Sequence, residues 1–214
     1  MATKKKASKE PESRQAAYSA RNRARLIRNA QEVLAEIGPS ATIEEIAAHA
    51  EVSPTTIYKY FENKDQLFIE ALGEAWDGFI AWAYSSLTPG GPLENTLEAG
   101  RKIFWIRKSH PQYAAMIQNS LNQMPDFLIR SNKTSKAVFR ELSSKGLLKQ
   151  DDFDERFIIW TSIYSGILKS VYVTEELTPA EADVAFGIGL SVWGISEAQA
   201  KKLISRPLSF APVE

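Results

Sequence analysis

The side chains in this sequence that could do chemistry are hydroxyl and ammonium groups gathered between residues 42 and 64. Such groups donate hydrogen bonds to phosphate oxygens and to base edges, which is the chemistry of DNA contact. An alternative is that they only cover the solvent face of a helical bundle, but such a face would be richer in glutamate and poorer in tyrosine. The group consists of Thr42, Ser53, Thr55, Thr56, Tyr58, Lys59, Tyr60 and Lys64.

Two short helices are predicted to position these groups. Thr42 and Glu45 form a capping-box pattern that opens one helix, which should end near Glu51. Ser53 followed by Pro54 opens the next, because serine caps a helix and proline at its first position loses no needed hydrogen bond. The two helices are joined by a tight turn, which is the arrangement of a helix-turn-helix over residues 42–61.

The apolar residues of this segment predict which side faces inward. Ile57 and Phe61 lie four residues apart and should point into a core, which leaves the hydroxyls and Lys59 outside. Apolar positions at helical spacing between residues 26 and 37 predict a first helix of about four turns behind the pair. Gly38 and Pro39 then supply a helix stop.

The sequence from residue 21 to residue 72 resembles the TetR (tetracycline-repressor-like) family of bacterial regulators. The resemblance is carried by residues 42–50, 52–61 and 63–67 at fixed spacing. It implies that Thr55, Thr56 and Tyr58 contact bases or the thymine methyl group. Tyr60 and Tyr58 would also reach phosphate oxygens, and Lys59 could contact either.

The resemblance also implies roles at the helix ends. Thr42 and Ser53 would cap helices whose N-termini face phosphate, and Lys64 would pair with the DNA backbone. Glu51 departs from the family pattern, which usually has glycine in the turn. We expect some backbone strain there, a local difference in structure, and an added negative charge near the duplex.

The rest of the chain continues the helical period and shows no alternating strand pattern. Asn63 and Gln66 open a fourth helix, and Thr178 and Ser196 cap the last two, of which the first should be long. Other helices are expected over residues 93–109, 111–121, 125–145 and 154–172. The fold class is all-α, with about nine or ten helices. We expect a disordered basic arm (1–18), then a three-helix DNA-binding domain (19–66), and then a larger helical ligand-binding and dimerisation domain (67–214).

Aromatic residues in the middle of the chain suggest a pocket for a mostly apolar or aromatic small molecule. For any one of them, ordinary core packing is the alternative, and His110 before Pro111 also fits a helix-end role. The candidate pocket residues are Trp76, Phe79, Trp82, Phe104, Trp105, His110, Tyr113, Met116, Gln118, Trp160 and Tyr164, with Phe127 and Phe139 in the same aromatic group.

Small residues at helical spacing suggest where two helices approach closely. DNA half-sites require two-fold symmetry, so we expect a homodimer packed through these residues, with close packing inside one subunit as the alternative. The candidate interface residues are Ser162, Gly166, Ser170, Gly187, Ser191 and Gly194.

Composition narrows the function classes. The chain has no cysteine and two histidines, which argues against thiol chemistry and metal sites and fits a reducing cytoplasm. The longest apolar stretch is too short to span a bilayer. Residues 1–28 hold nine basic and two acidic residues, whereas residues 65–214 have a net charge of −3, so only the first part fits a polyanion.

No catalytic or cofactor-binding motif is present, so we expect neither an enzyme nor a cofactor. The sequence therefore predicts a DNA-binding transcriptional regulator, by default a repressor that a ligand releases from a palindromic operator. An architectural protein that binds duplexes regardless of sequence, mainly through the basic arm, is the alternative.

Overall fold

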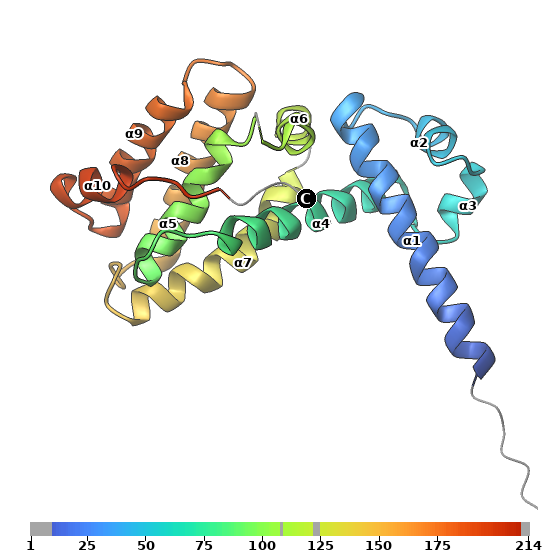
Figure 1. The fold of residues 1–214 in the computed structure, drawn as a ribbon, viewed down its shortest axis with the longest axis horizontal. Helices are drawn as coiled ribbons and strands as arrows, with labels where there is room; N and C mark the ends of the chain where they lie inside the picture. The colour runs from blue at the N-terminus through green and yellow to red at the C-terminus, as the bar shows by residue number, and fades with distance from the viewer. Residues whose placement is uncertain (1–9, 108, 122–124, 211–214) are drawn as a thin grey trace, which may run out of the picture.

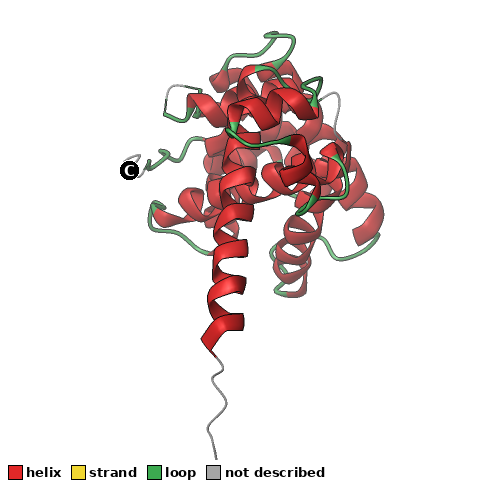
Figure 2. Cartoon of the chain, turned by 90° about the vertical axis from the view of Figure 1, so that its right-hand side faces the viewer, coloured by secondary structure: helices red, strands yellow, loops and turns green. Residues whose placement is uncertain are grey.

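Twelve helical segments follow one another in the computed structural model, which describes residues 10–107, 109–121 and 125–210 (Figure 1). None of these described residues forms a strand, which confirms the all-α prediction (Figure 2). The α-helices are α1 (Glu10–Glu36), α2 (Ile43–His49), α3 (Pro54–Tyr58), α4 (Lys64–Ser85), α5 (Pro92–Lys102), α6 (Pro111–Ser120), α7 (Pro125–Ser144), α8 (Phe153–Tyr172), α9 (Pro179–Gly189) and α10 (Glu197–Ile204), with 3-10 turns η1 (Ile103–Trp105) and η2 (Leu190–Trp193).

The first helix is longer than the sequence pattern predicted. It begins at Glu10 rather than after residue 18, so residues 10–18, expected in a disordered arm, are helical. This part is rich in alanine, arginine, glutamate and glutamine, which favour a helix even without a buried face. It projects beyond the other helices in both views (Figures 1 and 2). The arm lysines Lys4, Lys5, Lys6 and Lys9 lie outside the described residues.

Helix starts follow the predicted caps. The backbone N–H of Glu45 donates to Thr42 Oγ1 over 3.2 Å, and the N–H of Thr42 donates to the Glu45 carboxylate over 2.7 Å. Ser53 caps α3 in front of Pro54, and Asn63 caps α4. Each cap satisfies a donor that the helix would otherwise leave unpaired.

Two hydrophobic cores divide the molecule, and α4 belongs to both. Its first half places Leu67 and Phe68 among buried residues of α1, α2 and α3. Its second half places Phe79 and Ala83 in the core formed by the later helices. In Figure 1, α4 runs from the α1–α3 unit into the larger one. A movement of α4 must therefore be felt in both cores, since packed interiors resist local change.

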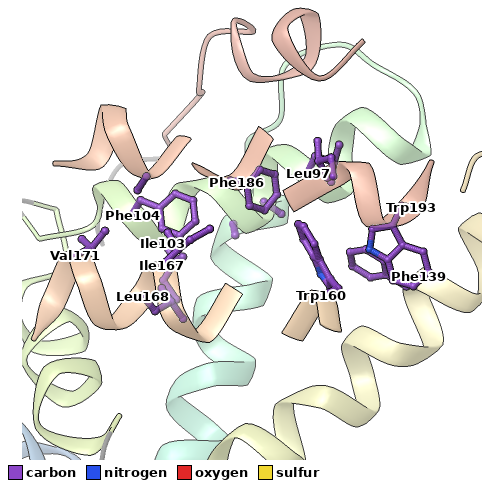
Figure 3. Close-up of a cluster of buried hydrophobic side chains, with 14 of the residues drawn as sticks. Leu97, Ile103, Phe104, Phe139, Trp160, Ile167, Leu168, Val171, Phe186 and Trp193 are labelled. Atoms are coloured by element: carbon purple, nitrogen blue, oxygen red, sulfur yellow. The ribbon is translucent and has the colours of Figure 1, made fainter. Parts of the chain in front are cut away.

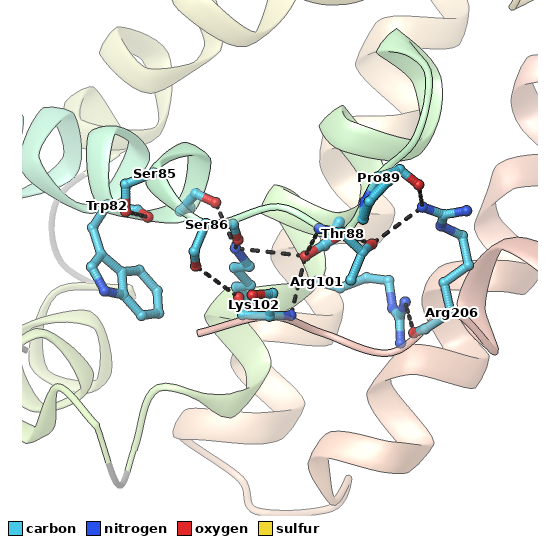
Figure 4. A network of polar contacts seen from close by, with 11 residues as sticks. Trp82, Ser85, Ser86, Thr88, Pro89, Arg101, Lys102 and Arg206 are labelled. Carbon is cyan, nitrogen blue, oxygen red and sulfur yellow. Dashed lines mark hydrogen bonds and ion pairs between the residues drawn. The ribbon is translucent and has the colours of Figure 1, made fainter. Parts of the chain in front are cut away.

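A buried polar network fixes α5 beneath the C-terminal segment (Figure 4). Lys102 Nζ donates to the backbone oxygens of Ala83, over 2.7 Å, and Ser86. Burial lowers the pKa of Lys102, and the neighbouring Glu98 carboxylate opposes that shift. Arg206 donates to Pro89 O over 2.7 Å, so the segment just after α10 (Glu197–Ile204) is held against the loop before α5.

The expected long helix after Thr178 is shorter than predicted. Helix α9 ends at Gly189, and the chain continues as the 3-10 turn η2. Inside the subunit, Arg101 holds α9 through a double hydrogen bond to Asp183, with both distances 2.8 Å. None of the described helices combines the length and hydropathy needed to cross a membrane.

Candidate functional site

The turn between α2 and α3 is tight, and Glu51 fits into it without disrupting the helix-turn-helix. Glu51 has φ of 53°, in the left-handed region that glycine prefers. Its N–H donates to Ala48 O over 3.1 Å, and the N–H of Val52 donates to Ala47 O over 2.9 Å. These two bonds form a Schellman helix end. The strain expected at Glu51 is therefore present in the backbone angle, while the turn itself remains regular.

Helix α3 has one buried face and one polar face. Ile57 and Phe61 are buried, as predicted. Thr55, Tyr58 and Lys59 are exposed on the other side, with 53% of Tyr58 accessible to solvent. These exposed groups can donate and accept hydrogen bonds in a groove without rearrangement of the helix.

Four of the candidate hydroxyl groups have polar partners within the chain. Thr42 is exposed, and its hydroxyl is used in the α2 cap. The hydroxyls of Thr56 and Ser53 lie 3.0 Å apart at the start of α3. Tyr60 is half-buried, and its oxygen accepts a hydrogen bond from Asn22 Nδ2 over 3.3 Å.

Lys64 has contacts within the chain. Its ammonium donates to Pro39 O over 3.0 Å and lies 5.7 Å from the centre of the Phe68 ring. In this arrangement Lys64 is half-buried and ties α4 to the loop before α2. Its pairing with the DNA backbone stays a prediction.

The exposed arginines of α1 give this unit its positive charge. Arg14, Arg21, Arg25 and Arg28 recur at intervals of three, four and seven residues and are all exposed. Residues at that spacing lie on one side of a helix. Arg23, on another side, is occupied by an ion pair with Glu70 and lies over the Phe61 ring.

A cavity of about 120 Å³ lies in the second core, between α4, α5, α6, α7 and α8. Four candidate pocket residues line it: Trp76, Phe79, Trp160 and Tyr164. Figure 3 shows Trp160 and Phe186 side by side in this core, where their rings meet edge to face with centroids 5.1 Å apart. The cavity wall therefore combines aromatic side chains with aliphatic and hydroxyl-bearing ones.

The other candidate pocket residues lie outside the lining of this cavity, because their helices turn them elsewhere. Trp82 packs against His110, whose ring stacks on Tyr113. Burial lowers the pKa of His110, which favours the neutral ring. These three residues therefore do not line this cavity, although Tyr113 lines a smaller one next to Trp76 and Phe79. Their role in ligand binding stays a prediction.

Four further candidates also lie elsewhere. Phe104 is a core residue that packs on Phe186, and Trp105 donates its indole N–H to Asp183 over 3.2 Å. Met116 belongs to the core of the N-terminal unit, and Gln118 is exposed. Phe127 lies in the part of α7 whose side chains are outside the described residues.

Sequence reasoning missed the polar lining. Tyr84, Thr96, Thr134, Ser135, Thr161 and Ser165 line the cavity beside the aromatic residues. The signal was the helical spacing itself: Ile80 and Tyr84 follow Trp76 at intervals of four and belong to the same helix face. The side chain of Phe139, noted for its aromaticity, also lines the cavity.

Helices α8 and α9 pack on each other and expose apolar residues on their outer sides. Ile158 is 65% exposed, Val184 54% and Ile188 70%. Of the candidate interface residues, Ser162, Gly166 and Ser191 are exposed on the same helices or on η2. The exposed isoleucines were missed, because apolar periodicity alone does not separate an outer face from a core.

Three candidate interface residues take part in contacts within the subunit. Gly187 is buried, and a Cβ there would meet Ile204 at 3.1 Å, so its small size serves the packing of α9 on α10. Gly194 forms a left-handed turn after η2. The hydroxyl of Ser170 donates to Glu176 over 3.3 Å.

A helix-turn-helix beside a basic helix, joined by α4 to a helical domain with an internal cavity, defines a DNA-binding regulator. Residues 26–71 match the family model described as "Bacterial regulatory proteins, tetR family". The regulator TcmR of Streptomyces glaucescens is 25% identical over 151 residues, which covers 65% of this chain and 67% of TcmR.

Solved structures share the fold. RolR in complex with resorcinol superposes with a TM-score of 0.71 at 20% identity, covering 91% of this chain and 98% of RolR. SmeT, the repressor of a Stenotrophomonas maltophilia multidrug efflux pump, gives a TM-score of 0.61 at 16% identity, covering 80% of this chain and 89% of SmeT. Residues 26–71 therefore match the tetR-family model, and the described part of the chain shares its fold with RolR and SmeT.

Proposed function

We propose that this regulator is a dimeric repressor that a small molecule releases from a palindromic operator. The observation that carries the proposal is a cavity whose α6 wall is also bonded to the DNA-binding unit. A site that can take a ligand and a mechanical connection to the DNA-binding helices are the two elements that an inducible repressor requires.

On DNA, helix α3 would lie in the major groove. Thr55, Tyr58 and Lys59 are the exposed groups that would meet base edges and phosphates. Thr56, Ser53 and Tyr60 would support them from the helix ends. The arginines on the outer side of α1 would add phosphate contacts that depend on salt but not on sequence.

The partner subunit would pack on α8 and α9. The exposed side chains of Ile158, Val184 and Ile188 are a group of large apolar residues that a stable monomer rarely leaves in water. Gly166 and Ser162 would allow the helices of two subunits to approach closely. A two-fold axis there would place two α3 helices on opposite half-sites.

Ligand binding would reach the DNA-binding unit through α6. Ile117 lines the cavity, and two residues later Asn119 Nδ2 donates to Leu34 O over 3.1 Å and to Ala35 O over 3.0 Å. These oxygens belong to the last turns of α1. A ligand that displaces α6 would therefore tilt α1, and with it α3.

The relatives support a ligand-controlled repressor. RolR was solved with resorcinol in place, and SmeT is named as a repressor. Thermodynamic linkage requires that operator and ligand weaken each other's binding equally, typically by about 1–3 kcal/mol.

The experiment begins by selecting duplexes from a random pool with the purified chain. The bound duplex is then titrated with resorcinol and a library of small phenols while fluorescence anisotropy is followed. Release of the duplex by a compound that also binds the free chain supports the proposal. Selection without an enriched sequence, or compounds that bind without any effect on the duplex, would contradict it.

A further inference from the structure

The described lining of the cavity contains no ionisable side chain of the acidic or basic kind. Aspartate, glutamate, lysine, arginine and histidine are all absent from it among the residues that the structure describes. The polar side-chain groups are uncharged: the indole N–H groups of Trp76 and Trp160, and hydroxyls contributed by Tyr84, Thr96, Thr134, Ser135, Thr161, Tyr164 and Ser165. A charged ligand would therefore find hydrogen bonds but no counter-charge.

The buried charges nearby are already paired and belong to other parts of the domain. Arg101 is held by Asp183 at 2.8 Å, and Lys102 is bonded to backbone oxygens beside Glu98. None of the four lines the cavity. Recruiting one of them to a ligand would leave its present partner buried and unpaired, which is strongly unfavourable.

The hydroxyl of Tyr164 in the cavity wall is neutral. Tyr164 donates to Gly100 O over 2.7 Å, and burial raises its pKa far above the usual value. Its oxygen remains able to accept a hydrogen bond from a ligand. Elsewhere in the lining, the hydroxyl of Tyr84 donates to Thr96 Oγ1 over 3.4 Å. Such groups suit a ligand hydroxyl or carbonyl.

The size of the cavity limits the ligand. Its volume is about 120 Å³. In a protein interior, an apolar cavity of about 150 Å³ holds one benzene molecule. A ligand with one aromatic ring would therefore fill the space, with aromatic contacts from Trp160 and Phe79 in the wall.

We infer, resting on the proposed function, that the effector is an uncharged single-ring aromatic compound with hydroxyl or carbonyl groups. Carboxylates and ammonium compounds of the same shape are excluded by desolvation, because a buried ion without a partner is costly. The lining thus acts as a filter on charge as well as on size.

Three probes of matched shape test the inference on the full chain at neutral pH: benzyl alcohol, benzoate and benzylammonium. Binding is measured by saturation-transfer NMR and by quenching of tryptophan fluorescence, in the millimolar to micromolar range expected for such small ligands. We expect benzyl alcohol to bind at least about tenfold more tightly than either ion. Equal or tighter binding of benzoate or benzylammonium would overturn the inference.

A substitution in the lining locates the effect. Thr134 lines the cavity but is exposed, so Thr134→Lys should be tolerated by the fold. It should shift the preference toward benzoate by at least about tenfold. Lys133→Thr, next to it and outside the lining, is the control and should leave the order unchanged.

The outcomes separate this inference from the proposed function. An unchanged preference in Thr134→Lys would overturn the assignment of the probe site to this cavity. Failure of all three probes to bind would overturn the ligand class. Release of the operator duplex by some other compound would in each case leave the repressor itself standing.

Discussion

Tyr58 is the residue of α3 whose substitution should affect DNA binding most clearly. Its neighbour Ile57 is completely buried, whereas half of Tyr58 faces solvent on the polar side of α3. Tyr58→Ala should weaken binding to the selected duplex by about 1–3 kcal/mol, because both the ring and the hydroxyl leave the interface. Anisotropy titration measures this, and sedimentation checks that assembly is intact. Tyr58→Phe separates the hydroxyl from the ring, and wild-type affinity in Tyr58→Ala would remove Tyr58 from the site.

Glu51 offers a test of backbone strain and charge together. Glu51→Gly should relieve the strain of the left-handed backbone conformation. The greater freedom of glycine in the unfolded chain offsets part of this gain. The free energy of unfolding should therefore change by less than about 1 kcal/mol. Operator affinity should rise, because a carboxylate beside the duplex is removed. Asp152→Gly relieves a similar φ of 52° far from α3 and is the control. An unchanged affinity in Glu51→Gly would place this turn away from DNA.

For single residues, the sequence predicts contacts between neighbours in the chain better than contacts between distant helices. The caps at Thr42, Ser53 and Asn63 follow from four consecutive residues and are all present. The cavity lining depends on how α4 is rotated against later helices. Trp76 and Trp82 are equally aromatic, yet only Trp76 lines the cavity.

Among the elements, α6 connects the cavity to the DNA-binding unit. Asn119→Ala should remove two hydrogen bonds to the end of α1 and destabilise the fold by about 1–2 kcal/mol. It should also reduce the factor by which a releasing compound weakens duplex binding. The measurement is duplex affinity with and without that compound. Gln118→Ala, next to it but exposed, should keep the full factor. Equal factors in both variants would exclude Asn119 from the coupling.

Helix α1 should contribute affinity that does not depend on sequence. Replacing Arg14 and Arg21 by alanine should reduce the salt dependence of duplex binding by about one unit of slope for each phosphate that is no longer neutralised. Selected and shuffled duplexes should be affected alike. The double variant Lys201→Ala/Lys202→Ala makes the same charge change in α10 and should leave the slope unaltered. A slope unchanged in the α1 variant would make these arginines a solvated face.

The length of α1 shows that apolar periodicity alone does not predict where a helix begins. Apolar periodicity begins at Leu26 because the buried apolar side chains of α1 begin there. Just before it, Asn22 and Arg23 make polar contacts with Tyr60 and Glu70, and such contacts leave no apolar periodic signal. Helix propensity, which was available in the sequence, would have extended the prediction.

For the whole molecule, we propose that a second subunit covers the exposed apolar side of α8 and α9. Ile188→Asp should place a charge in the subunit interface and shift the chain to monomers. A monomer holds one half-site, so operator affinity should fall at least about a hundredfold. Light scattering and duplex titration measure the two effects. Leu147→Asp, at an exposed residue outside α8 and α9, is the control. A stable dimer in Ile188→Asp would move the interface elsewhere.

The division of the molecule into a DNA-binding unit and a larger helical unit could be anticipated from the motif and the charge distribution. The residues of a subunit interface could not be anticipated in the same way. Gly187 and Gly166 both belong to series of small residues at helical spacing, but Gly187 is buried within the subunit and Gly166 is exposed. Only the packing of α10 on α9 separates them.

We propose that α3 recognises a DNA sequence. The most direct measurement compares the affinity of the full chain for the selected duplex and for a shuffled duplex of equal length at about 150 mM salt. We expect the selected duplex to bind at least about a thousandfold more tightly, with two protomers on each duplex. Equal affinities that fall together as salt rises would contradict the claim and indicate sequence-independent binding.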